Sequence, residues 1–212
     1  MQNRVIIPEI LDSLDPTDPR AIRSRWDLRW IDFFLGNSRW ILRQLQKHNP
    51  EQILEIGAGE GDLCRKILSA LPSPRSITGL DLIQRPANLP DDIPWVSGDF
   101  FQTLNDLKAD TCVGSLILHH FSASALRDLG ARLQSFRCLI FCEPLRSRLP
   151  LALSNLSSGL VGEVTRHDMP ASIRAGFRVA ELPALLGLDS TKWIIRESSD
   201  WRGALRLVSL KR

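Results

Sequence analysis

The chain has 212 residues, enough for one α/β domain with a helical attachment and a continuous hydrophobic core. Its 27 Lys and Arg residues against 24 Asp and Glu residues leave a formal net charge of +3, which is too small to indicate nucleic-acid binding by itself. No apolar run is long enough to span a bilayer and the N-terminus shows no secretory signal pattern, so we expect a cytoplasmic protein.

Residues 1–49 are expected to form an N-terminal helical cap or lid. Residues 1 to about 19 are rich in Pro and Asp and predict an irregular arm with one short turn. From Asp18 onward, apolar residues at helical spacing predict a helix that ends at Gly36. These residues are Ile22, Trp26, Trp30, Phe33 and Phe34. The four aromatic ones could line an apolar pocket or pack the helix onto the sheet. A second helix should follow, capped by Asn37 or Ser38.

After Pro50, strand patterns alternate with helix patterns, which predicts a parallel, doubly wound sheet. The expected strands are 53–56, 76–82, 95–96, 111–118 and 138–142, with helices over 62–71 and 123–134. This part, residues 50–212, is the expected ligand-binding domain.

The last part of the chain departs from the alternation. Several helical pieces, broken by Pro150, Pro170 and Pro183, form an expected insertion at about 145–188. Strands over 192–196 and 205–210, joined by a turn at Ser198-Ser199-Asp200, predict a closing antiparallel hairpin. Together these elements predict a Rossmann-like α/β fold with seven strands.

The four cysteines carry little functional information. Cys64, Cys112, Cys138 and Cys142 show neither the paired spacing of zinc sites nor a disulfide framework. Three of them fall inside apolar runs, where a thiol packs as a small core residue in a reducing compartment. We therefore expect no metal site.

The most informative segment is a glycine turn that follows the first strand, with the pattern E-x-G-x-G-x-G from Glu55 to Gly61. Glycines let the backbone approach a ligand closely, and the next helix directs free N–H groups at it. Dinucleotide-binding proteins have a third glycine one position later, where this chain has Asp62, so an NAD-dependent oxidoreductase is disfavoured. The segment instead resembles the first motif of class I S-adenosylmethionine (SAM)-dependent methyltransferases. A simple tight turn is the alternative.

Three further segments resemble that class, in the same order. Asp81 ends the second strand, where a carboxylate can accept both ribose hydroxyls or can cap a loop. Asp99 and Phe100 resemble the segment that frames the adenine, although Asp99 could also be a helix cap. The run 110–121 resembles the fourth-strand motif, and it lacks the Asn/Asp-Pro-Pro-Tyr/Phe signature of DNA amino-methyltransferases.

The resemblance implies that SAM is the cofactor and that S-adenosylhomocysteine (SAH) is its product. It implies a cofactor site made of Glu55, Gly57, Ala58, Gly59, Gly61, Asp81, Leu82, Asp99, Phe100, Ser115 and Leu116.

Histidines are the candidate catalytic residues, because an oxygen acceptor benefits from a general base near neutral pH. His119 and His120 should end the fourth strand on the cofactor side. His167 is the other candidate, with Asp168 orienting a partner or starting a helix before Pro170. Structural roles are open for all three.

The expected function is methyl transfer to a small aromatic or lipophilic acceptor, through O-methylation. The chain resembles quinone-biosynthesis and polyketide-tailoring methyltransferases in its size and in its N-terminal helical cap. An RNA or protein methyltransferase is one alternative, motivated by Arg20, Arg23, Arg25, Arg29, Arg146 and Arg148. A SAM-binding protein without catalysis is another. We expect no nucleic-acid partner and no membrane span, and the sequence does not indicate an oligomeric state.

Overall fold

A mixed sheet of seven strands organises the protein, as shown by a computed structural model that describes residues 3–71 and 76–212. The strands are β1 Gln52–Ile56, β2 Ser76–Asp81, β3 Trp95–Ser97, β4 Thr111–Ser115, β5 Cys138–Pro144, β6 Trp193–Ser199 and β7 Ala204–Lys211. Their order is β3-β2-β1-β4-β5-β7-β6. Strands β1 to β5 pair in parallel, whereas β7 is antiparallel to both β5 and β6. The predicted α/β fold with its antiparallel closing hairpin is confirmed.

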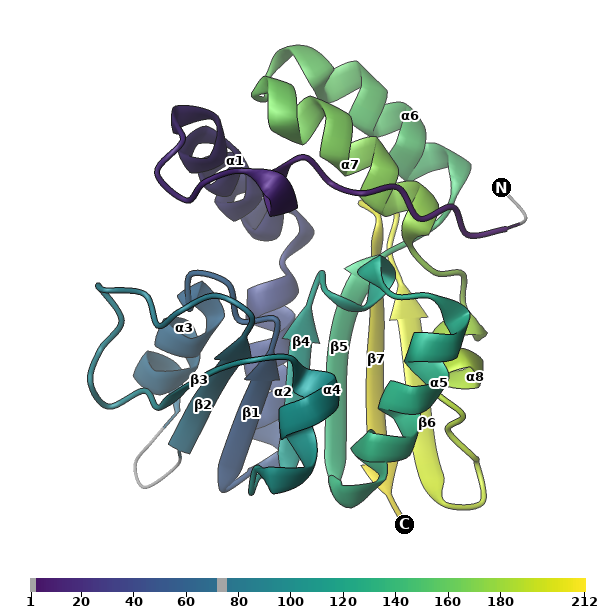
Figure 1. Ribbon diagram of the computed structural model, residues 1–212. Helices are drawn as coiled ribbons and strands as arrows, with labels where there is room; N and C mark the ends of the chain where they lie inside the picture. The colour runs from purple at the N-terminus through teal and green to yellow at the C-terminus, as the bar shows by residue number, and fades with distance from the viewer. Residues whose placement is uncertain (1–2, 72–75) are drawn as a thin grey trace.

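Helices cover both faces of the sheet (Figure 1). They are α1 Pro19–Leu35, α2 Asn37–His48, α3 Asp62–Ala70, α4 Phe100–Thr103, α5 Ala123–Arg132, α6 Arg148–Leu156, α7 Glu163–Ala175 and α8 Glu181–Leu185. Ile41 of α2 and Ile67 of α3 are buried in one core cluster, while Leu129 of α5 and Leu186 pack in a second one. With apolar residues on both faces, β5 is buried along its whole length.

A third group of elements lies beyond the carboxyl ends of the parallel strands. Figure 1 shows α1, α6 and α7 above that edge, with the N-terminal arm, residues 3–18, crossing beside α7. The strand order reverses between β1 and β4, which is where open α/β sheets form a ligand crevice. The fold therefore places the glycine turn and the end of β4 beside each other, below these elements.

The first two helices agree with the sequence in their bounds but not in the second cap. Asp18 caps α1 by accepting from the Arg20 N–H, and Gly36 ends it with φ of 72°. Helix α2 starts at Asn37 directly after Gly36, without a side-chain cap. The predicted cap by Asn37 or Ser38 is wrong, because the Ser38 hydroxyl donates back to Asp32 in α1.

The prolines do not break the helices of residues 145–188 as predicted. Pro150 and Pro183 lie in the first turns of α6 and α8, where a missing N–H costs nothing. Pro170 lies inside α7, which begins at Glu163. Asp168 is therefore a mid-helix residue and does not start the helix.

Two strand boundaries also differ. Strand β4 stops at Ser115, three residues before the predicted end, because Leu116 adopts a left-handed conformation with φ of 58°. His119 and His120 consequently lie in a short 3-10 turn, η3 (Leu118–His120), and not on the strand. Ser198 and Ser199 belong to β6, so the hairpin turn lies over 200–203.

Among the described residues, no helix is long and apolar enough to cross a membrane.

Candidate active site

The glycine turn forms an open cradle after β1. Gly57, Gly59 and Gly61 all have positive φ, at 66°, 52° and 74°. A Cβ on Gly57 would lie 2.5 Å from Ile117 Cγ1, so this glycine lets the turn pack against the segment after β4. A Cβ on Gly59 would meet no atom within 4 Å. The backbone at Gly59 thus faces open space at the crevice, as a cradle for a ligand requires.

The Asp81 carboxylate lies directly beside this cradle. Its Oδ2 accepts from the Gly59 N–H at 2.8 Å, and its Oδ1 accepts from the Ile83 N–H at 3.1 Å. Asp81 therefore caps two loops in this structure, which was the alternative interpretation of the residue. Leu82, next to it, is 76% exposed. An acidic group and an apolar side chain stand together at the rim of the crevice.

Glu55 lies beneath the turn and contacts α3. It is 3% exposed, and the Cys64 thiol donates to its Oε2 at 2.8 Å. Burial raises the pKa of Glu55 to about 8, since a charged carboxylate loses its hydration there. The carboxyl group is consequently mostly neutral at pH 7. The carboxyl group and the thiol connect the strand and the helix on either side of the glycine turn.

The Asp99 segment forms a short helix start. The Asp99 side chain caps α4 by accepting from the Phe101 N–H at 2.8 Å. Phe100 is 7% exposed, and its ring centroid lies 5.1 Å from that of Phe121 in an edge-on contact. Asp99 is therefore a helix cap in this structure, which was the alternative interpretation of this residue. The ring of Phe100 rests on Phe121, which follows η3, so this segment also faces the end of β4.

The segment after β4 carries backbone strain. Leu116 is a non-glycine residue at φ of 58°, held by its N–H bond to the Cys142 carbonyl oxygen at 2.8 Å. Such conformations cost about 1–3 kcal/mol and occur preferentially at ligand sites. Ser115, one residue earlier, is half-buried. This strained turn lies beside the glycine turn, because Ile117 packs onto Gly57.

Ion pairs hold α1 over the glycine turn. Arg25 lies 3.4 Å from Glu60, and Arg29 lies 2.8 Å from Asp62. Two further arginines of the helix pair with carboxylates of the same segment: Arg20 with Asp18, and Arg23 with Asp27. Arg146 is buried and contacts Glu181, whereas Arg148 is exposed. The arginines of α1 are thus used in internal ion pairs, which weakens the motivation for an RNA-binding face.

The apolar residues of α1 neither pack onto the sheet nor lie in a closed pocket. Their exposed fractions are 54% for Ile22, 46% for Trp26, 56% for Trp30, 63% for Phe33 and 51% for Phe34. Edge-on ring contacts join Trp26 to Trp30 and Trp30 to Phe33. The buried residues of this helix are the small or polar ones, Ala21, Ser24 and Asp27. Here the pattern of apolar residues does not mark the buried face.

His119 lies in a buried polar cluster that joins η3, β5 and the N-terminal arm. Its Nδ1 is 2.8 Å from Glu143 Oε2, and its Nε2 is 3.4 Å from Glu9 Oε1. Burial alone would lower the pKa of His119, but the hydrogen bonds to Glu143 and Glu9 outweigh it and raise the pKa to about 9. Both ring nitrogens face carboxylates, so His119 is poorly suited to accept a proton.

His120 stacks beside His119, with ring centroids 4.2 Å apart, and its Nδ1 lies 3.5 Å from Asp12. Burial and the neighbouring His119 lower the pKa of His120. Neither Glu9 nor Asp12 could be predicted as a site residue, because both come from an irregular arm without a motif. Their role depends on a contact between segments about 110 residues apart.

His167 lies on α7 in a different setting. Its side chain is 47% exposed, and its Nδ1 is 2.8 Å from Asp168 Oδ1. Asp168 is buried and also accepts from the Ile10 and Leu11 N–H groups of the arm, at 2.9 and 3.0 Å. The structure thus brings His119 and His120 together and holds His167 in its own pair with Asp168.

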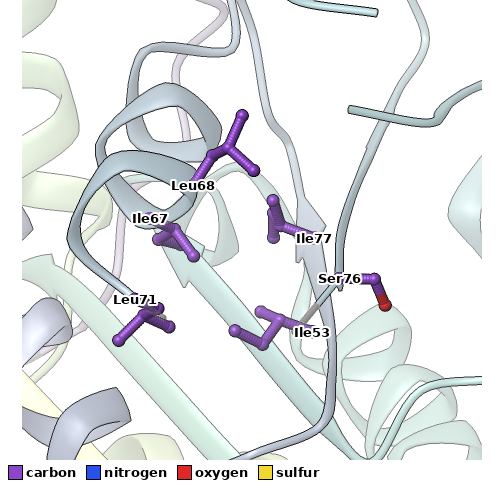
Figure 2. Close-up of a pocket in the computed structure, with 6 residues that line it drawn as sticks. All are labelled: Ile53, Ile67, Leu68, Leu71, Ser76 and Ile77. Atoms are coloured by element: carbon purple, nitrogen blue, oxygen red, sulfur yellow. The ribbon is translucent and has the colours of Figure 1, made fainter. Parts of the chain in front are cut away.

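A small, partly open pocket lies at the amino ends of β1 and β2 (Figure 2). Its lining residues are Ile53, Ile67, Leu68, Leu71, Ser76 and Ile77. They come from the start of β1, the start of β2 and the end of α3, away from the glycine turn. We assign no functional role to this pocket.

Solved structures of methyltransferases share this fold. A scan against protein-family models finds no match, and neither does a search of curated proteins. The plantazolicin methyltransferase BamL, solved with a triazolic desmethylPZN analog and SAH, is 12% identical, with a TM-score of 0.74 over 95% of this chain and 92% of that one. The protein has the class I methyltransferase fold.

Two more structures give the same result. The plantazolicin methyltransferase BpumL, solved with a monoazolic desmethylPZN analog and SAH, is 14% identical, with a TM-score of 0.71 over 92% of this chain and 91% of that one. Human N-acetylserotonin methyltransferase, solved with SAM, is 17% identical, with a TM-score of 0.64 over 94% of this chain and 61% of that one. At such identities the similarity concerns the fold.

Proposed function

We propose that this protein is a SAM-dependent methyltransferase that acts on a small aromatic or lipophilic acceptor, with oxygen as the methylated atom. The observation that carries the proposal is the open cradle at Gly59, which lies next to Asp81 in a turn that packs against the segment after β4. It lies at the position where this fold reverses its strand order and forms a ligand crevice.

The residues of the crevice fit SAM. Gly57, Ala58, Gly59 and Gly61 would hold the methionine and ribose part by their backbone, and the helix start behind them offers N–H groups. Asp81 would exchange its two backbone partners for ribose hydroxyls. Leu82 and Phe100 would contact the adenine ring, and Asp99 would accept from its exocyclic amine. Ser115 and Leu116 would lie near the sulfonium. Glu55 would lie below the turn.

SAM supplies a methyl group that an acceptor oxygen takes in an in-line displacement. The protein contributes position and a site with little water, which can provide most of the acceleration. The cover is formed by α1, α6, α7 and the arm (Figure 1). It presents large exposed apolar side chains, among them Leu149, Leu156 and Leu160. These favour an aromatic or lipophilic acceptor.

We assign the general base to His167. A histidine that donates from Nδ1 to a fixed carboxylate keeps Nε2 as a proton acceptor, and Asp168 is fixed by two backbone N–H groups. His119 is held between two carboxylates, and His120 belongs to the same cluster. Both retain candidate roles in positioning the acceptor.

Binding and transfer assays test the proposal. Calorimetry with SAH and with NAD tests the cofactor, and a methyl-transfer screen against phenols, quinol precursors and fatty acids tests the acceptor. Once an acceptor is identified, His167→Gln should lower kcat by roughly 100-fold. If His120→Gln or His119→Gln lowers kcat to this extent and His167→Gln does not, the base is in the buried cluster.

A further inference from the structure

The cluster at η3 contains the donor set of a metal site. The ligand atoms of Glu9, His119 and His120 all lie within 4.8 Å of one another. Two imidazoles and one carboxylate are a common set for a divalent transition metal such as zinc. We propose that this site binds one such cation, with Zn²⁺ as the best match, and that the cation fastens the N-terminal arm to η3.

The spacing of two of these atoms also fits two ligands of one cation. His119 Nε2 and Glu9 Oε1 are 3.4 Å apart, at the long limit for a hydrogen bond. Two ligand atoms about 2.0–2.1 Å from a tetrahedral ion are separated by about 3.4 Å. The observed separation therefore allows both side chains to bind one metal ion without moving apart.

The second nitrogen of His119 is already held in the manner of a metal ligand. Glu143 is fully buried, and its Oε2 is hydrogen-bonded to Nδ1 of His119 at 2.8 Å. This bond directs Nε2 of His119 toward Glu9. Its two carboxylate oxygens also accept backbone N–H groups from Ile117, Leu118 and His119, at 3.0, 2.8 and 3.2 Å. A carboxylate that orients a histidine in this way is typical of protein metal sites.

Charge at the cluster also favours a cation. Glu9 and Glu143 both face the one imidazole of His119, and Asp12 lies 3.5 Å from His120 on the more exposed side. Arg4 contributes one positive charge nearby, where its Nη2 donates to the His119 carbonyl oxygen at 3.0 Å.

The cation would join two segments far apart in the sequence. Glu9 comes from the arm, and the Ser172 hydroxyl of α7 donates to its Oε1. Arg4, the Val5 N–H bond to the Arg174 carbonyl oxygen and the two N–H bonds to Asp168 also hold the arm. His119 and His120 belong to η3, directly after the strained turn of the crevice. Metal binding would therefore stabilise the arm across the carboxyl edge of the sheet. This proposal does not rest on methyl transfer.

Calorimetry with ZnCl₂ on the full chain, after dialysis against EDTA and then chelator-free buffer, tests the site. We expect one saturable site per chain. Glu143→Gln should weaken binding by about 10- to 100-fold, and Glu9→Gln and His120→Gln by at least about 100-fold because they remove inner ligands. His48→Gln, which replaces a histidine at the end of α2, is the matched control and should bind normally.

A second measurement keeps the test valid if a variant folds poorly. Hydrogen exchange of the wild-type chain should show the Ile10 and Leu11 amides better protected with Zn²⁺ than with EDTA, and Co²⁺ should give the visible absorption of a tetrahedral site. No saturable binding of Zn²⁺, Co²⁺, Ni²⁺ or Mn²⁺ would overturn the proposal. So would folded Glu9→Gln and His120→Gln proteins that bind Zn²⁺ like the wild type, or arm amides that Zn²⁺ leaves unchanged.

Discussion

Two regions meet at the carboxyl edge of the sheet, and they are built in different ways. The crevice beside the glycine turn comes from short motifs, each directly after a strand, and the sheet brings them together. The cluster around His119 comes from an irregular arm, a 3-10 turn and a buried strand residue, joined over about 110 residues. The first kind of site is visible in local sequence, whereas the second exists only once the chain has folded.

The largest expected effect tests the cradle of the crevice. Gly59→Val places a branched side chain in the open space beside Asp81, so SAH affinity should fall by roughly 100-fold, or about 2.7 kcal/mol. Gly187→Val is the matched control, because Gly187 also has positive φ, 61°, with no atom near its Cβ position. It carries similar backbone strain away from the crevice. Equal SAH affinity of the two variants, by calorimetry, would contradict the placement of the cofactor.

The next effect tests the buried cluster. Glu143→Gln removes the charge that faces His119 and weakens three backbone hydrogen bonds, so the free energy of unfolding in EDTA should fall by about 3 kcal/mol. Urea unfolding at pH 7 measures it. The exposed Glu163→Gln is the control. A change in the Glu143→Gln protein no larger than in this control would show that the cluster contributes little to stability.

A smaller effect tests how the arm is held. Asp168→Ala leaves the Ile10 and Leu11 N–H groups without their carboxylate acceptor, which should cost about 2 kcal/mol in arm docking. Hydrogen exchange at these two amides and tryptic cleavage after Arg4 should both accelerate. Asp15→Ala, which alters an exposed arm residue bonded to Thr17, should leave both rates unchanged. Unchanged rates in the Asp168→Ala protein would show that other contacts hold the arm.

The smallest effect concerns Glu55 below the glycine turn. Its pKa in the folded protein, about 8, lies above the ordinary value of 4.5, so the folded state binds more protons than the unfolded state between those pH values. Glu55 alone should therefore lower the free energy of unfolding as pH rises through this window, by about 1 kcal/mol between pH 6.5 and 7.5. His119, whose pKa is also raised, to about 9, adds a fall of the same sign. Glu55→Gln should make the slope shallower by the contribution of Glu55, and the exposed Glu51→Gln should keep the full slope. Parallel profiles for wild type and Glu55→Gln would contradict the buried neutral carboxyl group.

Much of the fold could be predicted from the sequence because the sheet follows local rules. The spacing of apolar residues and the turn residues between them predicted all seven strands. Gly36, which has a positive φ, predicted the end of α1. The end of β4 was wrong because it depends on the conformation of Leu116, which the Cys142 carbonyl holds and no local pattern reveals. The helix breaks were wrong because a proline ends a helix only outside its first turn, and Pro170 is tolerated inside α7.

The candidate site divides in the same way. Gly57, Gly59 and Asp81 were predicted together and lie together, since parallel strands end at one edge. Glu9 could not be predicted, because nothing in the arm marks it and its partners lie in other elements. The alternative in which the aromatic residues pack α1 onto the sheet is wrong. Ion pairs to the glycine turn and a contact between small polar residues of α1 and α7 fix this helix instead.

Calorimetric titration of the purified full chain with SAH and, separately, with NAD is the most direct test of the proposed function. We expect saturable one-to-one binding of SAH that Gly59→Val weakens and Gly187→Val does not, with no measurable binding of NAD. Binding of NAD without binding of SAH would contradict the methyltransferase assignment.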